Sequence, residues 1–227
     1  MPQTLNDLVS VDDPAGPLLR EWLDAGDVET QVLDVEPARR DQCLVGLQVT
    51  LRSVLGAVAY ETGGILVDHG WLRLLGGGHA ALPSLYEALG LDDATAAPNY
   101  VVLGWDVVGG VFALDGGALR GVKGHVCYYA PDALQWEDLE FGHADFVQWA
   151  LTGGLSTFAG DLRWEGWEKE TSLVPLDEVY LSDPPLWTLE GQEIDEADRR
   201  HVRVDELLAR HGEAAAAMAH PTENRPD

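Results

Sequence analysis

The chain has 227 residues, with 39 acidic and 14 basic side chains and a formal net charge of -25. A protein that grips nucleic acid needs a basic stripe to displace counterions from phosphates, and this sequence carries none. The charge therefore excludes direct binding to nucleic acid and to anionic membrane surfaces. The hydrophobic fraction of 46% is nevertheless typical of a globular protein and predicts a packed core.

The two ends of the sequence suggest where the protein resides and how far its domain extends. The first residues lack the basic start and apolar run of a secretory signal, and no apolar stretch approaches the roughly 20 residues of a membrane helix. We therefore expect a cytoplasmic protein with no membrane contact. The length favours one domain over residues 1–219, followed by a disordered tail over 220–227. Cys43 and Cys127 are expected to be buried free thiols.

In chain order, the pattern begins with helices over 13–26 and 37–49 that flank a short strand over 28–36. Apolar runs at 54–60, 65–67 and 71–75 are separated by glycine turns and predict antiparallel strands. A short helix ending at Gly90, a strand pair over 99–121 and a strand over 125–131 follow. After Pro131 we expect helices over 144–151 and 155–170, a last strand at 200–204 and a helix from Asp205. The fold class is α+β: a central, mostly antiparallel sheet with helices packed on it and a helical C-terminal part.

Motifs for catalysis and for cofactor binding are missing from the sequence. The glycine clusters fit neither GxxxxGK[ST] nor GxGxxG, and there is no GxSxG, HExxH or CxxC. A metal could be assembled only from scattered residues, such as His125 and Cys127 with His79 or His143, whose spacing is unspecific. We therefore expect no catalytic residue, no metal and no cofactor.

The acidic charge is concentrated in one part of the chain. Residues 131–200 hold 17 acidic and 4 basic side chains, which is more than half of the net charge, and several tryptophans lie among them. Tryptophan anchors surrounded by carboxylates suit binding to a basic protein, because aromatic rings supply desolvated contacts and charge steers the encounter. The predicted partner-binding residues are Trp136, Glu137, Asp138, Glu140, Trp164, Glu165, Trp167 and Glu168.

Two other interpretations remain open. Asp68, His69, Trp71 and Asp106 lie at strand ends beside glycine turns and could line the pocket of a small-molecule-binding protein or an enzyme. Alternatively, the tryptophans fill the core and the acidity reflects only solubility or adaptation to salt.

Long segments of the sequence resemble a known bacterial family. The run GAVAYETGGILVDHGWLRLLGGGH, together with DVVGGVFALDGG, YYAPDALQWEDLEFGHADFVQWALTG and FAGDLRWEGWE, resembles the domain of unknown function numbered 2625, over nearly the whole chain. Residues 109–115, 126–129 and 146–151 are also similar in order to the SUKH superfamily, which includes the Smi-Knr and Syd proteins and immunity proteins against bacterial toxins. This second resemblance implies a non-catalytic protein that binds a basic toxin.

Overall fold

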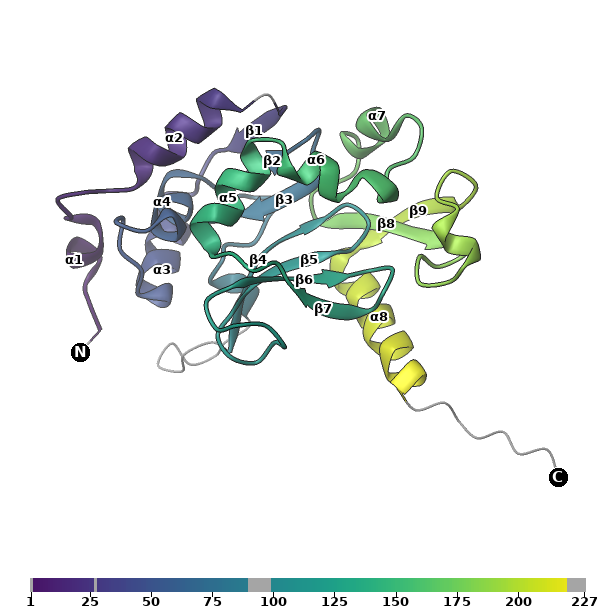
Figure 1. Cartoon of the computed structure of the whole chain (residues 1–227). Coiled ribbons are helices and arrows are strands. Elements are labelled where there is room, and N and C mark those ends of the chain that lie inside the picture. Colours follow the sequence, from purple (N-terminus) through teal and green to yellow (C-terminus); the bar gives the residue numbers. More distant parts are fainter. Residues whose placement is uncertain (1, 27, 90–98, 220–227) are drawn as a thin grey trace.

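The computed structural model describes residues 2–26, 28–89 and 99–219, and its centre is a seven-stranded sheet. The strands pair in sequence order and every pair is antiparallel, as Figure 1 shows. They are β1 (Thr30–Leu33), β2 (Gly64–Val67), β3 (Leu72–Leu75), β4 (Tyr100–Asp106), β5 (Val111–Asp115), β6 (Val126–Ala130) and β7 (Gln135–Asp138). A separate antiparallel pair is formed by β8 (Glu178–Asp183) and β9 (Asp198–Arg203).

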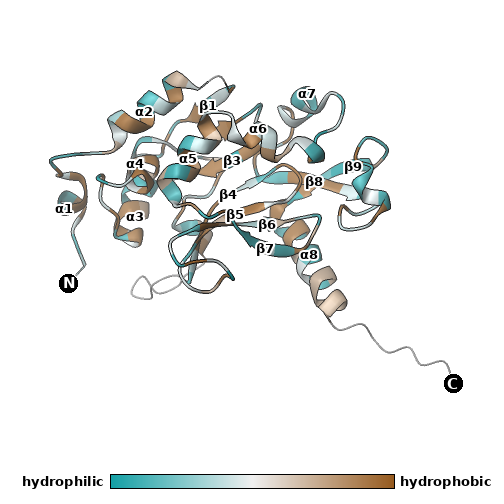
Figure 2. Ribbon diagram, viewed as in Figure 1, coloured by the Kyte–Doolittle hydropathy of each residue, from teal (hydrophilic) through white to brown (hydrophobic). Residues whose placement is uncertain are grey.

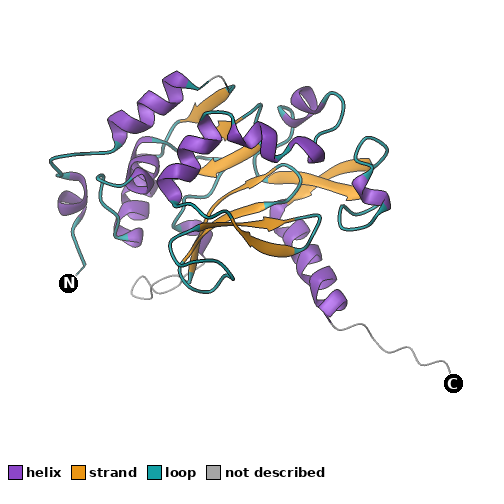
Figure 3. Ribbon diagram, viewed as in Figure 1, coloured by secondary structure: helices purple, strands orange, loops and turns teal. Residues whose placement is uncertain are grey.

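Helices surround these strands (Figure 3). Those before the second strand are α1 (Leu5–Val9), α2 (Gly16–Ala25), α3 (Pro37–Leu47) and α4 (Val54–Glu61). Those after the sheet are α5 (His143–Leu151), α6 (Gly154–Phe158), α7 (Trp167–Thr171) and α8 (Val204–Ala219), with short 3-10 turns η1 (Glu87–Leu89), η2 (Gly160–Leu162) and η3 (Glu190–Gln192). The α+β class with a mostly antiparallel sheet is thereby confirmed.

The two faces of the sheet have different covers. Phe112 of β5 packs against Phe146 of α5, with ring centroids 5.0 Å apart, and this face is closed by helices. On the opposite face, Tyr129 stacks on His211 of α8, and the Arg73 Nη1–H donates to the Glu178 carbonyl at the start of β8. The C-terminal strands and α8 therefore form a second cover, and the sheet lies between the two layers.

Residues 54–61 form a helix, so the strand expected over 54–60 is wrong. Ser53 accepts a hydrogen bond from the Gly56 N–H and begins α4, which then packs against α2, α3 and α5. Five of the eight residues of α4 are buried, so the helix is apolar on nearly all sides. A short helix buried in this way gives a continuous apolar run that resembles a buried strand.

The region after Pro131 also departs from expectation, because its described residues form three strands, of which only the last, β9, matches the strand expected at 200–204. The expected helix over 155–170 is divided into α6, η2 and α7, with Gly166 in the left-handed region at φ 82 just before α7. Strands β7 and β8 are not among the expected elements: β7 is a polar edge strand, and β8 is a six-residue strand with three buried residues.

Helix α2 begins at Gly16, with Ala15 rather than Asp13 as its N-cap, and ends at Gly26 as expected. The predicted end of a helix at Gly90 and the predicted disordered tail over 220–227 lie outside the described residues.

Figure 2 shows the hydrophilic character of α7 and β9 beside the apolar strands of the sheet.

Candidate functional site

The turn between β2 and β3 holds two of the residues predicted to line a pocket. Asp68 and His69 adopt left-handed backbone at φ 56 and 57, and Gly70 follows at φ 77. Asp68 is 7% exposed and its carboxylate accepts hydrogen bonds from Ser156 Oγ at 2.9 Å and from Arg163 Nη2 at 2.5 Å. The Asp68 carboxylate is thus occupied by partners within the protein and joins the turn to the segment that begins with α6.

The predicted pocket residue Trp71 lies against the predicted partner-binding tryptophans. Its ring centroid is 5.9 Å from that of Trp164 and 5.3 Å from that of Trp167, and the Arg163 guanidinium lies 4.0 Å from the Trp167 ring centroid. Trp71 is fully buried and Trp164 is 3% exposed, with its Nε1–H donated to Glu170. These residues form a packed aromatic cluster, which brings together side chains that the sequence assigned to two separate sites.

Asp106, the fourth predicted pocket residue, belongs to a different set of contacts. Its buried carboxylate accepts hydrogen bonds from Tyr128 Oη at 2.7 Å, the Val108 N–H at 3.0 Å and the Gly110 N–H at 2.7 Å. Burial raises the pKa of Asp106, while these hydrogen bonds oppose the rise. A Cβ on Gly110 would lie 2.2 Å from both the Asp106 carboxylate and the Tyr128 hydroxyl. The Asp106 carboxylate is thus occupied by donors within the protein and organises the β4–β5 turn.

The remaining predicted partner-binding residues divide into exposed and engaged side chains. Glu137, Glu140, Glu165 and Glu168 are exposed. The Asp138 carboxylate accepts hydrogen bonds from the Val122 and Glu140 N–H groups and contacts His125 Nδ1 at 3.0 Å. The Val122 hydrogen bond is the main reason that the pKa of Asp138 is lowered. Trp136 is half-buried between Tyr100 and Tyr129 at the outer strand of the sheet.

A small cavity lies beside the β2–β3 turn and includes one predicted residue, His69. Its volume is about 100 Å³, and it lies between the sheet and the segment after α7. The lining residues are Glu29, Gln31, Leu66, His69, Gly70, Arg73, Thr171, Ser172, Val174 and Leu176. His69 is held by Glu29, whose carboxylate accepts the His69 backbone N–H at 2.9 Å.

Arg73 forms part of the inner wall of this cavity. The side chain is fully buried, and its Nη1–H donates to the Glu178 carbonyl at 3.1 Å, but Nε and Nη2 have no partner in the described structure. Burial lowers the pKa of Arg73 to about 10, with Asp106 opposing this shift through its charge. The side chain therefore remains charged at pH 7, enclosed and without a carboxylate within ion-pair distance among the described residues. Thr171 Oγ1, on the same cavity, is also buried and unpaired.

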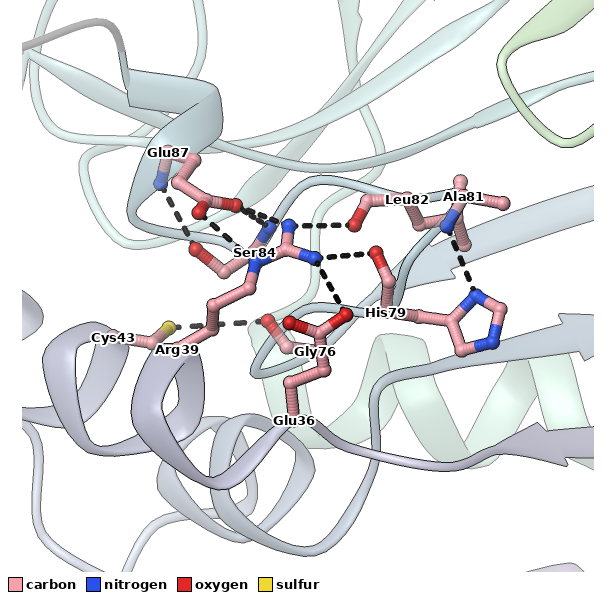
Figure 4. A network of polar contacts seen from close by, with 9 residues as sticks. All are labelled: Glu36, Arg39, Cys43, Gly76, His79, Ala81, Leu82, Ser84 and Glu87. Atoms are coloured by element: carbon pink, nitrogen blue, oxygen red, sulfur yellow. Dashed lines mark hydrogen bonds and ion pairs between the residues drawn. The ribbon is translucent and has the colours of Figure 1, made fainter.

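A second arginine shows what a structural role looks like in this fold (Figure 4). Arg39 donates from Nη1 to the His79 carbonyl, from Nη2 to the Leu82 carbonyl and from Nε and Nη2 to the Glu87 carboxylate. Every nitrogen of this guanidinium is engaged, and the arginine joins α3 to the loop before η1. Near it, burial raises the pKa of the Cys43 thiol to about 11, so the thiolate nucleophile is disfavoured. Arg73 has no such network.

Arg73 was not predicted as a site residue, although the sequence carries a signal for it. The segment LRLL places one arginine inside a strand whose other residues are all buried and apolar. Arginine is almost never fully buried without a partner, so a charged residue at the centre of such a run marks an unusual environment. Only the structure shows that Glu178, 105 residues later, supplies just one acceptor.

Neither a metal centre nor a spanning helix is found in the part of the chain that the structure describes. Over residues 2–26, 28–89 and 99–219, histidine, cysteine and carboxylate side chains do not gather in threes that could hold a metal ion. Over the same ranges no helix is both long and apolar enough to cross a membrane. Cys43 and Cys127 are buried free thiols, as expected.

Comparisons with known proteins identify relatives over most of the chain. The family model described as "Protein of unknown function DUF2625" matches residues 5–207. The uncharacterised protein YbfG of Escherichia coli (strain K12) is 38% identical over 183 residues, covering 81% of this chain and 85% of that protein. An uncharacterised protein of Haemophilus influenzae (strain ATCC 51907 / DSM 11121 / KW20 / Rd) is 32% identical over 207 residues, covering 89% and 91% respectively. No solved structure matches.

Proposed function

The chain belongs to the DUF2625 family, and we propose that it is a non-catalytic binding protein whose cavity beside Arg73 takes a small carboxylate ligand. The observation that carries the proposal is the unpaired Nε and Nη2 of a fully buried guanidinium. These two nitrogens form one edge of the planar group, and their N–H bonds run parallel, which is the geometry that binds a carboxylate with two hydrogen bonds.

The cavity sets the size of the group that Arg73 can hold. A volume of about 100 Å³ matches roughly three water molecules, since each takes about 30 Å³ of liquid, so only a small carboxylate group fits. The Thr171 hydroxyl adds one further donor. Because Arg73 is fully enclosed, direct contact requires residues 171–176 to move slightly away from the sheet. The rest of a longer ligand would extend past His69 toward solvent.

The test is calorimetric titration of the full chain with acetate at constant ionic strength, with acetamide as the uncharged ligand of similar shape. We expect saturable binding of acetate and none of acetamide. Thr171→Val, which keeps the side-chain shape, should weaken acetate binding by about tenfold or more, because one hydrogen bond to the charged carboxylate is lost. Arg73→Met should abolish it. If wild type fails to bind acetate, or Arg73→Met binds it equally well, the proposal is wrong.

The outer sheet edge supports a second candidate, the acidic protein-binding surface expected from the sequence. On β7, exposed Glu137 lies next to half-buried Trp136, whose ring centroid is 6.2 Å from that of Tyr100, itself 42% exposed. An aromatic patch beside carboxylates suits a basic partner. In its most specific form, this candidate is a cytoplasmic immunity-type protein, similar in role to SUKH proteins, that covers the nucleic-acid surface of a basic toxin.

A pull-down at low salt with matched variants tests this second candidate. We expect wild type to retain a basic protein that Trp136→Ala and Glu137→Lys lose, whereas Glu21→Lys, a charge reversal on the distant helix α2, retains it. Loss of the partner from all three variants would instead indicate non-specific attraction to the net charge.

A further inference from the structure

Three side chains from neighbouring strands lie in a row on the sheet face that forms one wall of the cavity beside Arg73. Gln31 of β1 lies opposite Leu66 of β2, and Leu66 lies opposite Arg73 of β3. Residues directly opposite each other on paired strands point to the same face of a sheet, and all three line the cavity. Glu29 continues this wall two residues before Gln31, where its backbone carbonyl accepts the Asp68 N–H at 2.7 Å. The strand register therefore brings these side chains to one cavity.

The cavity carries opposite charges at its two ends. At the inner end, the Arg73 guanidinium is fully buried, and its Nε and Nη2 have no partner among the described residues. At the mouth, the Glu29 side chain is 57% exposed and supplies the carboxylate of the lining. Because β2 lies between β1 and β3, the backbones of these two residues are roughly 10 Å apart or more, which is twice the spacing of neighbouring strands. A ligand that matches both groups needs a negative charge at one end and a positive charge at the other.

Two polar groups at the mouth of the cavity have oxygen atoms that the protein does not use. Glu29 Oε2 accepts the His69 N–H at 2.9 Å and lies 3.4 Å from His69 Nδ1, whereas Oε1 has no hydrogen bond or ion pair among the residues that the structure describes. The Gln31 side chain is exposed on the same wall, and its carboxamide hydrogen-bonds to no described residue. Both oxygens can accept hydrogen bonds from a cationic group.

We propose that this cavity binds a short linear ω-amino acid in its zwitterionic form. The inference rests on the carboxylate site proposed above and adds the second charged group of the ligand. The carboxylate end pairs with the free edge of the Arg73 guanidinium, and the ammonium end donates to Glu29 Oε1 and to the Gln31 carboxamide oxygen. The volume of about 100 Å³ limits the chain between the two charges to a few methylene groups.

Charge separates this ligand from other small carboxylates. A monocarboxylate such as butyrate places an apolar end beside the Glu29 carboxylate, and a dicarboxylate places a second negative charge there, which repels. An α-amino acid holds its ammonium group next to its own carboxylate, whereas Arg73 and Glu29 lie on strands separated by a third. A zwitterion has no net charge, so the field of a chain with net charge -25 does not repel it as it repels an anion.

The experiment is calorimetric titration of the full chain with β-alanine and with butyrate, in which a methyl group replaces the ammonium group. We expect β-alanine to bind about fivefold tighter than butyrate, the effect of an ion pair that remains in contact with solvent. L-Alanine, the isomer whose ammonium group lies next to the carboxylate, should bind at least about threefold weaker than β-alanine. Binding of butyrate or of L-alanine as tight as that of β-alanine would overturn the proposal.

Glu29→Gln removes the charge at the mouth but keeps an oxygen that can accept the His69 N–H. It should lower the affinity for β-alanine by about fivefold and leave the affinity for butyrate within about twofold. Glu168→Gln is the matched control, because Glu168 is an exposed glutamate of α7 that does not line the cavity. Its substitution should change both affinities by less than about twofold. Equal losses of β-alanine affinity in the two variants would indicate non-specific attraction to the net charge and overturn the proposal.

Failure of the ω-amino acid and failure of the carboxylate site give different results. If acetate, butyrate and β-alanine all fail to bind, the carboxylate site itself is absent and both proposals are wrong. If acetate and butyrate bind and Arg73→Met abolishes their binding, but β-alanine binds no tighter than butyrate, the carboxylate site stands and the ω-amino acid is wrong. Circular dichroism of each variant verifies its fold.

Discussion

Replacing Arg73 by methionine should make the protein more stable while abolishing ligand binding. The pKa of about 10, well below the usual pKa of an arginine side chain, corresponds to a charge-burial cost of about 3 kcal/mol. Arg73→Met removes this cost and the two unpaired donors, and methionine adapts well to an irregular core. Buried charged groups replaced by apolar side chains often leave a protein more stable by about 1–4 kcal/mol.

Two losses partly offset the stability that Arg73→Met gains. The Glu178 carbonyl loses its hydrogen bond from Arg73, which costs about 1 kcal/mol, and a shorter side chain packs less completely. We therefore expect the free energy of unfolding to rise by about 1–2 kcal/mol, and the melting temperature by about 2–4 °C for each of those kcal/mol in a chain of this size. Urea and thermal unfolding at pH 7, followed by tryptophan fluorescence without added carboxylate, measure both quantities.

Arg39→Met is the control that distinguishes a structural arginine from an unpaired one. Because every nitrogen of the Arg39 guanidinium is engaged, Arg39→Met breaks several hydrogen bonds and an ion pair and should destabilise the protein by about 3 kcal/mol or more. If Arg73→Met destabilises the protein to a similar extent, the Arg73 guanidinium is part of the structural framework. The cavity beside Arg73 would then not be a ligand site.

Two further predictions concern the buried polar groups. Burial lowers the pKa of His211 to about 4, so between about pH 6.5 and 4 the unfolded state takes up a proton that the folded state does not, and stability falls as the pH falls. The free energy of unfolding of His211→Phe, relative to that of wild type, should therefore rise by about 2 kcal/mol between pH 8 and pH 5, as measured by urea unfolding at both pH values. If this difference in unfolding free energy is the same at both pH values, His211 does not govern the acid response. Gly110→Ala should destabilise the protein by more than about 2 kcal/mol, because the added Cβ displaces Asp106. Gly160→Ala is the control: a Cβ there meets nothing within 4 Å, so the free energy of unfolding should change by less than about 1 kcal/mol. Thermal unfolding of both variants measures these changes, and equal destabilisation would contradict the prediction.

The sequence predicted the sheet well where glycine turns divide apolar segments. Strands β2 and β3 are short and lie on either side of a turn ending in Gly70, so the pattern of turns identifies them directly. It failed at α4, because an apolar run of seven residues has the same composition whether it is buried between helices or between strands. It failed at β7 for the opposite reason: an edge strand with alternating exposed and half-buried residues carries too little apolar pattern to be recognised.

The candidate site depends on contacts that no local pattern encodes. His69 was predicted to line a pocket because it lies at a turn, and local chemistry is sufficient for that expectation. Arg73 becomes a candidate only through the position of Glu178 and Thr171, which fold back onto the sheet from far along the chain. Trp164 shows the same limit, since its place in an acidic segment suggested a contact surface but tertiary packing buries it against Trp71.

The net charge of -25 makes a specific prediction about how ionic strength affects anion binding. An anion that approaches the Arg73 cavity crosses the repulsive field of the whole protein before it meets the arginine at close range. Added salt shortens the Debye length from about 30 Å at 0.01 M to about 10 Å at 0.1 M, which screens the distant acids strongly and the enclosed guanidinium contacts much less. Binding of acetate should therefore tighten over this range, whereas binding of a basic protein to the β7 surface should weaken. Calorimetric titration at both salt concentrations, with a weakly competing anion as the added salt, measures the direction. If acetate binding weakens with salt as it does for ordinary surface attraction, the positive groups that hold the anion lie in solvent and the Arg73 cavity is not the binding site.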